Sequence, residues 1–389
     1  MTPRRAAAAE AAARLAAANE AADFTGWDVY DALTSPLLAR VAVTPLMARV
    51  ALQAVKRSPV QLRGVLRVPK LQHTKGLALF ASAYARLARS EPDAGASPAG
   101  RVASDLAARL VDRAIRRPSG VGWGYDFPVH LRWGAYQPGE PNAVGTAFAG
   151  HALLDVADAL DQPELAEVAR AAARYAIAEL LTERGDGRFF AYYEGATAAI
   201  HNSSLLLAAL CARALDPGDE RLSGAADAVE FSVACQRADG SWPYGEEGNL
   251  GWVDGFHTAY NLDALEIWHR ATGDEPARAA LERGLKLYLD RLIDPDGAAR
   301  ASLASRYPVD IHALATAIST LTTLSRNGFE TGKTADRVLD WTLANMQRGD
   351  GRFAFQRHRR YRNSVPYIRW GDGHMLLGLA NYLTERESK

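Results

Sequence analysis

The chain has little cysteine, no excess of charge and no long uninterrupted apolar run. Its two cysteines, Cys211 and Cys235, are too few for a disulfide scaffold and show no CxxC spacing, so a reducing compartment is expected. Lys plus Arg and Asp plus Glu both number 45 in 389 residues. Such a balance gives no overall field that would draw the protein to nucleic acid. We therefore predict a cytoplasmic protein with no nucleic-acid partner.

We expect no transmembrane segment. Residues 36–55 are apolar but carry Arg40, Pro45 and Arg49. We interpret this region as an outer helix, with peripheral contact to a membrane surface as the alternative. Residues 1–24 are rich in Ala, and charged residues break up any signal-peptide core. They are expected to form a poorly ordered leader.

Alternation of apolar and polar residues, the pattern of a β-strand, is missing, whereas helical periodicity runs from end to end. Six segments are almost uniformly apolar, as in an inner layer of helices, and amphipathic segments lie between them, as in an outer layer. The inner type recurs every 52 to 70 residues. This repeat predicts an all-α fold, an (α/α)6 toroid, with residues 25–389 as a single domain. The inner segments begin at Gln72, Asn142, His201, Val253, Val309 and Arg369.

The links between these segments differ in length and composition. Links from an inner to an outer segment are short, whereas links from an outer to an inner segment are long and rich in Gly, Trp, Tyr and Arg. Long loops of this kind on a rigid frame are where function is usually placed. We expect the site at the toroid face that holds the N-terminal ends of the inner helices.

Two of the long loops, "QRADGSW" from Gln236 and "QRGDGRF" from Gln347, resemble the Gln-x-x-Asp-Gly-x-Trp loop of squalene-cyclase and prenyltransferase repeats. The stretches "GWDVYDALTSPLL", "KGLALFASAY", "DGSWPYG", "GFHT" and "RYPVDIHALATAI" resemble toroid proteins of cell-surface polysaccharide biosynthesis loci in bacteria and archaea. At the level of the fold, the chain is similar to N-acylglucosamine 2-epimerases and to uronyl hydrolases and lyases. These resemblances imply a carbohydrate setting, with a sugar or glycan substrate that can be lipid-linked.

Chemically capable residues gather at the starts of the inner segments. Five of the nine histidines lie there. The positive end of a helix favours a nearby anion and a neutral imidazole, which suits a base near pH 7. The simpler interpretation of each Asp is helix capping. The residues concerned are His73, Asn142, His201, Asn202, Asp254, His257, Asp310, His312, Asp372 and His374.

The long loops also carry arginines and aromatic rings. Arginines suit an anionic ligand such as a uronate, and aromatic rings suit the faces of sugars. The arginines are Arg132, Arg306, Arg369 and those of the run 357–362. The aromatic candidates are Trp123, Trp133, Tyr136, Tyr192, Tyr193, Trp242, Tyr244, Trp252, Tyr307 and Trp370.

The leading hypothesis is proton abstraction from an anionic, uronate-type sugar, leading to epimerisation or β-elimination. Such chemistry needs a base, an acid and groups that hold the developing enolate. The catalytic candidates are His257, His312, Tyr307, Asp254 and Asp310. The candidates for substrate binding are His73, Asn142, His201, Asn202, Trp242, Tyr244, Trp252, Arg306, Arg369, Trp370, Asp372 and His374.

Three alternatives stay open. Asp254, Asp310 and Asp372 could act as paired carboxylates in glycoside hydrolysis. A terpenoid cyclase or prenyltransferase would need DxDD, DDxxD or a thiolate metal site, and both cysteines are interpreted as packing residues. A glycan-binding toroid without catalysis would need the aromatic residues and arginines alone. We expect no cofactor and no metal, with a mixed His/Asp metal site at the inner-helix starts as a minor alternative.

Overall fold

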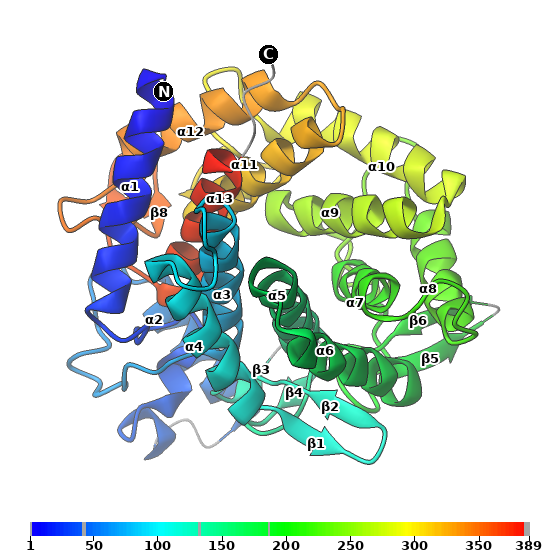
Figure 1. The fold of residues 1–389 in the computed structure, drawn as a ribbon. Coiled ribbons are helices and arrows are strands. Elements are labelled where there is room, and N and C mark those ends of the chain that lie inside the picture. The colour runs from blue at the N-terminus through cyan, green and yellow to red at the C-terminus, as the bar shows by residue number, and fades with distance from the viewer. Residues whose placement is uncertain (1, 41–43, 131–133, 186, 385–389) are drawn as a thin grey trace.

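The computed structural model describes residues 2–40, 44–130, 134–185 and 187–384. Six inner helices stand side by side in a closed ring, since each packs against the next and the last packs against the first (Figure 1). The predicted (α/α)6 toroid is confirmed. The inner helices are α3 (Thr74–Ala88), α5 (Ala143–Leu160), α7 (His201–Ala214), α9 (Gly255–Thr272), α11 (Ile311–Arg326) and α13 (His374–Leu383).

Outer helices cover the ring, and all but one of them pack against the inner helix that precedes them in the chain. Their exposed faces carry the charged residues, and their buried faces carry small and branched apolar residues that fill the space between the layers. Five of them correspond to the predicted amphipathic segments: α4 (Pro98–Asp112), α6 (Pro163–Tyr175), α8 (Leu222–Ala234), α10 (Glu275–Leu287) and α12 (Gly332–Met346).

The sixth outer helix is α1 (Pro3–Glu20), and here the structure corrects the expectation of a poorly ordered leader over residues 1–24. The helix lies against α13 and α12, and Ala8, Ala12 and Leu15 on one of its faces are buried (Figure 1). Arg4 pairs with two aspartates of α12. The sequence hides this packing because the buried stripe consists mainly of Ala, like the rest of the helix.

Helix α5 is the one described helix that is long and apolar enough to cross a membrane, and 72% of its apolar window is buried inside the protein. It owes that apolarity to its place in the inner ring. Neighbouring inner helices approach closely along small residues, and Gly150 lies against the side chain of Leu210 on α7. A side chain at position 150 would have to displace that leucine.

Short strands occur in the links that lead from outer to inner helices. All pair antiparallel, and none exceeds four residues, which is too short to produce a visible alternation in the sequence. The pairs are β1 (Ile115–Arg117) with β2 (Gly120–Gly122), β3 (Val129–His130) with β4 (Ala135–Tyr136), and β5 (Leu181–Arg184) with β6 (Gly187–Phe190). A three-stranded sheet joins β7 (Val309–Asp310), β8 (Gln356–Arg357) and β9 (Arg362–Asn363).

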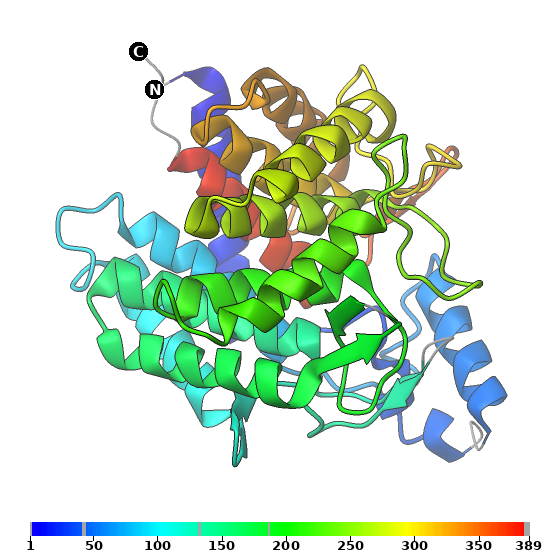
Figure 2. The same cartoon turned by 90° about the vertical axis from the view of Figure 1, so that its right-hand side faces the viewer.

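These links make one face of the toroid, which we call the mouth face, far more elaborate than the other. In Figure 2 the long loops and α2 (Pro45–Arg57) lie on the right-hand side. The loop after α8 shows how such a link is held. Gly240 adopts φ +87°, and the indole of Trp242 donates a hydrogen bond to the carbonyl of Ser232 at 2.8 Å. The Gly and Trp of this loop therefore secure its conformation.

Candidate active site

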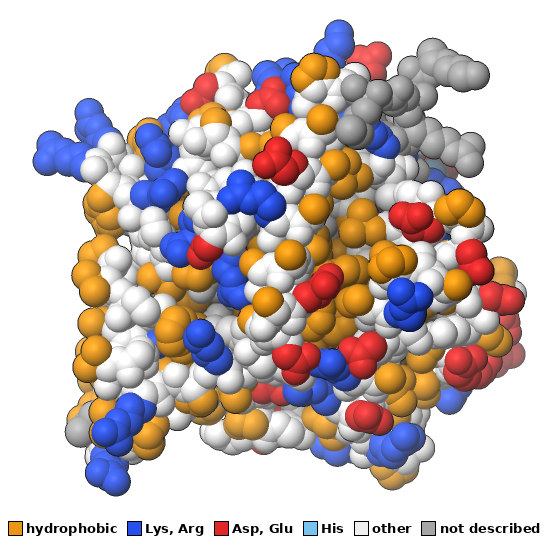
Figure 3. All heavy atoms as spheres, turned by 60° about the vertical axis from the view of Figure 1, so that its left-hand side comes forward, with side chains coloured by type: hydrophobic (Ala, Val, Ile, Leu, Met, Phe, Trp, Pro, Cys, Tyr) orange, Lys and Arg blue, Asp and Glu red, His pale blue; other side chains and the backbone are white. Residues whose placement is uncertain are grey.

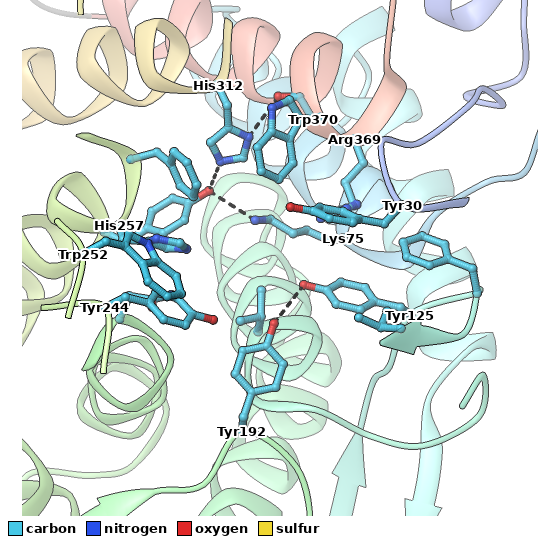
Figure 4. A pocket seen from close by; sticks show the side chains of 16 residues that line it. Tyr30, Lys75, Tyr125, Tyr192, Tyr244, Trp252, His257, His312, Arg369 and Trp370 are labelled. Atoms are coloured by element: carbon cyan, nitrogen blue, oxygen red, sulfur yellow. Dashed lines mark hydrogen bonds between the residues drawn. The ribbon is translucent and has the colours of Figure 1, made fainter. Parts of the chain in front are cut away.

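A pocket of about 220 Å³ opens on the mouth face at the centre of the ring (Figure 4). Nine of its sixteen lining side chains are Phe, Tyr or Trp, and none of those sixteen is Asp or Glu. The lining comes from the starts of inner helices and from the links before them, as the connection lengths predicted. Its character is that of an aromatic chamber with a few nitrogen-bearing groups.

Asp254 and His257 form a hydrogen-bonded pair at one wall of this pocket. Asp254 caps α9, with one carboxylate oxygen accepting from the backbone N–H of His257 at 2.9 Å. Its other oxygen lies 2.6 Å from Nδ1 of the same imidazole. Nδ1 therefore carries the proton and Nε2 is free to accept one. The capping role and the orienting role thus fall to a single carboxylate.

A second hydrogen-bonded group surrounds the phenol of Tyr260, whose ring centroid lies 6.3 Å from that of His257. His312 Nδ1 donates to the carbonyl of Trp370 at 3.0 Å, so its Nε2 accepts the phenol proton of Tyr260 at 2.6 Å. The phenol oxygen then accepts from His374 Nε2 at 3.1 Å. Burial lowers the pKa of both imidazoles well below their usual range and raises the pKa of Tyr260. The three groups are therefore neutral near pH 7.

Lys75, from the first turn of α3, also lines the pocket. Its ammonium nitrogen lies 3.2 Å from the Tyr260 oxygen and 4.0 Å from the ring centroid of Phe148. Within the described residues it forms no ion pair with a carboxylate. Burial lowers the pKa of this amine well below its usual range, and the positive charge of Arg369 lowers it further. The amine is thus a buried base that lacks a counter-ion.

Arg369 also reaches the pocket, but its charge is already matched. Two of its nitrogens each lie 2.7 Å from an oxygen of Asp28, and both side chains are buried. Arg63 and Asp31 make a second buried pair next to it, at 2.6 Å. The first pair fixes Asp28 to the π-helical turn that precedes α13, and the second joins Asp31 to the link before α3. A ligand would meet Arg369 as part of a neutral pair.

Tyr244 and Trp252 supply a flat aromatic wall beside His257. Their rings stack with centroids 4.6 Å apart and an interplanar angle of 12°. The indole of Trp252 also donates to Asp254 at 3.2 Å, so this wall and the Asp254–His257 pair form one unit. Asn202, at the start of α7, lines the pocket next to them. Figure 4 shows His257, Trp252 and Tyr244 on one side of the space and Lys75 with Tyr30 on the other.

Several predicted residues lie outside this pocket, and the loop geometry explains why. Tyr307 is an exposed loop residue, and Arg306 is held on the same loop by Asp294 and Asp296. Neither lines the pocket, so the structure corrects the expectation that they act there. The chain becomes buried at Asp310, just before α11 begins. Tyr307 is three residues earlier, so it still lies on the exposed part of the loop.

Asp310 and Asp372 are buried but serve other groups. Asp310 caps α11 and accepts hydrogen bonds from Gln356 at 2.7 Å and from the indole of Trp370 at 2.9 Å. It positions Trp370 and, by accepting from the backbone N–H of His312 at 2.9 Å, the start of α11, without lining the pocket itself. Asp372 is fully buried, 3.4 Å from Arg352, and burial raises its pKa to about 7. The expected set of three mouth carboxylates therefore reduces to Asp254.

The remaining predicted residues divide between structural and adjacent positions. His73 is buried against the ring of Phe127. Asn142 caps α5 by accepting from the N–H of Gly145 at 2.8 Å. Trp242 lies behind Asn202 and Asp254 in a narrow recess next to the pocket. His374 contributes through Tyr260, as described above. Among the broader set of expected mouth residues, Arg132 and Trp133 lie outside the described residues.

His201 belongs to a separate cluster between α7 and α8. Its Nε2 lies 2.8 Å from Glu246, and a ligand atom each from His201, Cys235 and Glu246 fall within 4.8 Å of one another. This is the one His, Cys, Asp and Glu cluster with metal-ligand spacing in the parts of the chain that the structure describes. An N, S and O donor set is one that Zn²⁺ accepts. Burial raises the pKa of Cys235 to about 11, so a metal would have to displace the thiol proton.

Lys75, Tyr260, Tyr30 and Tyr125 were not predicted as site residues. A signal existed for Lys75, because it is a single charge inside the otherwise apolar segment "TKGLALF". Tyr260 is three residues after His257 and so shares its helix face. Tyr30 and Tyr125 come from links whose path the sequence does not reveal.

No family model matches the sequence, and no curated protein matches it. Solved structures match by shape. A GH76 α-mannanase of Bacteroides thetaiotaomicron gives a TM-score of 0.61 at 12% identity, over 80% of this chain and 86% of that one. A cellobiose 2-epimerase of Bacillus thermoamylovorans gives 0.57 at 12%, over 79% and 87%. An unsaturated glucuronyl hydrolase specific for heparin gives 0.58 at 13%, over 79% and 85%. These likenesses show that the chain has the (α/α)6 toroid fold.

Proposed function

We propose that this protein is a carbohydrate-active enzyme that moves a proton on a uronate-type sugar, by epimerisation or β-elimination. The observation that carries the proposal is the Asp254–His257 pair at the wall of an aromatic pocket. The structures of similar shape include a sugar epimerase and enzymes that act on glycans, as their names state, and this supports the carbohydrate class.

His257 is the base in this proposal. Its Nε2 accepts the proton from the carbon next to the sugar carboxylate, and Asp254 stabilises the imidazolium that forms. The stacked rings of Tyr244 and Trp252 hold the sugar face beside it. In epimerisation, the ammonium of Lys75, which lies on the other side of the space from His257 (Figure 4), returns a proton to the opposite face of the carbon. In β-elimination, the imidazolium or the phenol protonates the leaving oxygen.

Lys75 supplies the reason to expect an anionic substrate. A carboxylate that enters the pocket gives the buried amine the counter-ion that it lacks. The resulting ammonium neutralises the carboxylate and stabilises the charge that develops on it when the neighbouring C–H bond breaks. Binding of the carboxylate is thus expected to be coupled to the uptake of one proton from solvent by Lys75. Arg369 does not compete for the carboxylate, because Asp28 already occupies it.

Glycoside hydrolysis is the second candidate, favoured by the hydrolases among the structures of similar shape. It would need two carboxylates on either side of the glycosidic bond. Among the residues that line the pocket and the recess beside it, Asp254 is the one carboxylate. A single carboxylate engaged with an imidazole fits proton abstraction better than paired-carboxylate chemistry.

The test is incubation with oligosaccharides that contain glucuronate, in deuterated water. Epimerisation gives deuterium in the recovered sugar, β-elimination gives an unsaturated product with ultraviolet absorbance, and hydrolysis gives reducing ends without either. We expect one of the first two signals and its loss in His257→Gln. Reducing ends alone would favour the hydrolase, and the absence of all three signals would refute the proposal for uronate sugars.

A further inference from the structure

Large apolar side chains that are exposed to solvent gather in one part of the molecule. All nine in the described residues lie in links that lead into the N-terminal ends of α3, α9, α11 or α13, on the mouth face. Six of them fall within residues 37–65. The nine are Leu37, Leu46, Met47, Val50, Val60, Val65, Trp252, Tyr307 and Tyr361.

The same links carry a concentration of positive charge in a chain that is neutral overall. Residues 32–70 contain seven Lys or Arg and no Asp or Glu, and residues 351–371 contain six Arg and no Asp or Glu. The two segments touch, because the side-chain amide of Asn363 donates to the carbonyl of Ser58 at 3.0 Å. We call the surface formed by residues 36–40, 45–70 and 356–363 the basic apolar face.

The exposed cations of this face have no partner of opposite charge among the described residues. On the outer layer, partly exposed arginines such as Arg4 and Arg278 pair with carboxylates. On the basic apolar face, nine exposed cations form no ion pair with any described residue. They are Arg40, Arg49, Arg57, Arg67, Lys70, Arg357, Arg359, Arg360 and Arg362. In Figure 3, Lys, Arg and hydrophobic side chains occupy the left-hand margin, where this face is seen edge-on, and the Asp and Glu side chains lie away from it.

Helix α2 is the centre of this face. Ala48, Leu52 and Val55 attach it to the protein, whereas Leu46 and Val50 project into solvent at 65% and 61% exposure. With 13 residues it is shorter than the roughly 20 residues needed to span a bilayer. An amphipathic helix that shows aliphatic side chains flanked by arginines suits the interface plane of a membrane. Nucleic acid would offer no partner for the exposed Leu and Val side chains.

We propose that the basic apolar face docks this protein on the surface of a membrane that contains anionic lipids. Leu46 and Val50 enter the boundary between headgroups and acyl chains, and the arginines lie among the lipid phosphates. The face adjoins the pocket, because Lys56 of α2 lies 2.7 Å from the hydroxyl of Tyr30, a residue that lines it. The docked protein therefore holds its pocket mouth beside the lipid surface. On the proposed function, the sugar would reach the pocket from a lipid carrier in that surface.

The experiment is sedimentation of the full chain with vesicles of phosphatidylcholine alone or with about one third phosphatidylglycerol, at about 0.1 M salt. The wild type is expected to sediment with the anionic vesicles and to be released by high salt. Arg49→Glu with Arg57→Glu reverses two charges and should weaken partitioning by about 30-fold or more. Leu46→Ser with Val50→Ser should weaken it at unchanged charge. The matched control, Lys333→Glu with Arg337→Glu on α12, makes the same charge change on the outer layer and should bind like the wild type.

Three outcomes would overturn the proposal. Equal losses in the α12 control and the α2 variants would show that net charge alone governs binding. Failure to sediment, with a dimer that the Leu46 and Val50 substitutions abolish, would assign the face to a second copy of the chain. A single-stranded oligonucleotide serves as a competitor, and loss of vesicle binding in its presence without any effect of Leu46 and Val50 would favour nucleic acid. All variants are compared by thermal melting, and because vesicle binding requires no turnover, the result is independent of the proposed reaction.

Discussion

Replacing Lys75 with Met tests whether the pocket holds a neutral amine. Met fills a similar volume but has no amine. In the wild type the buried amine of Lys75 contacts the phenol of Tyr260 and no described carboxylate. Burial lowers the pKa of Lys75 in the folded protein, whereas the unfolded chain keeps a pKa of about 10.4. Between these two pKa values the unfolded chain binds more protons, so the free energy of unfolding of the wild type rises with pH.

The magnitude follows from that linkage. Within the window, one extra proton in the unfolded state changes the free energy of unfolding by about 1.4 kcal/mol per pH unit. Lys75→Met lacks this contribution. It should therefore be more stable than the wild type near pH 7, and the difference should shrink by about 1.4 kcal/mol for each pH unit until it levels off above about pH 10. A change in packing would shift the two curves by a constant amount and leave this slope untouched.

The assay is urea unfolding of both proteins at about pH 7, 8 and 9, followed by tryptophan fluorescence. Lys286→Met, at an exposed site on α10 where Asp290 raises the pKa, serves as the control and should show no such convergence. Wild-type and Lys75→Met curves that stay parallel from pH 7 to 9 would show that Lys75 remains charged in the folded protein. Lys75 would then not be a neutral amine that awaits an anionic substrate.

Further substitutions probe the other parts of the site and fold. His257→Gln should lower kcat by about 10²- to 10⁴-fold without a change in melting temperature, and unchanged kcat would remove it as the base. Asp254→Asn should also lower kcat and, through loss of the charged cap, cost about 1 kcal/mol in urea unfolding; full activity would contradict its orienting role. Asp28→Asn leaves the buried charge of Arg369 unpaired and should cost about 3–5 kcal/mol, and a cost below about 1 kcal/mol would show that the pair is solvated. Gly240→Ala places a Cβ 2.4 Å from the carbonyl of Arg283 at positive φ and should destabilise the fold by more than about 1 kcal/mol in thermal melting, whereas a neutral effect would show that the loop relaxes freely.

The architecture was predictable because its determinants are local. Apolar segments at a regular period and short links on one side give the toroid and its mouth face directly. Helix α1 and the short strands were not predicted. Helix α1 completes the outer layer with Ala on both its buried and exposed faces, so no hydrophobic contrast marks it. The strands of two to four residues depend on loops that meet only after the ring has closed.

The site was predictable in part, for a related reason. The sequence at the start of α9 indicated Asp254 and His257 as candidates. A capping residue and the residue three positions after it lie on the same face of a helix, so the two side chains were expected to meet. The prediction that Tyr307 and Arg306 lie in the pocket was wrong, because both residues come before the point at which the chain turns into the ring. Which way a residue points on a long link depends on tertiary contacts, and the sequence carries little information on those.

The proposed function depends most on where a uronate sugar binds, and a crystal structure of His257→Gln with a glucuronate-containing disaccharide measures this directly. We expect the carboxylate at Lys75, a sugar face on Tyr244 and Trp252, and the carbon next to the carboxylate facing position 257. A disaccharide bound with its carboxylate at Arg306, or an empty pocket with the sugar elsewhere on the mouth face, would contradict it.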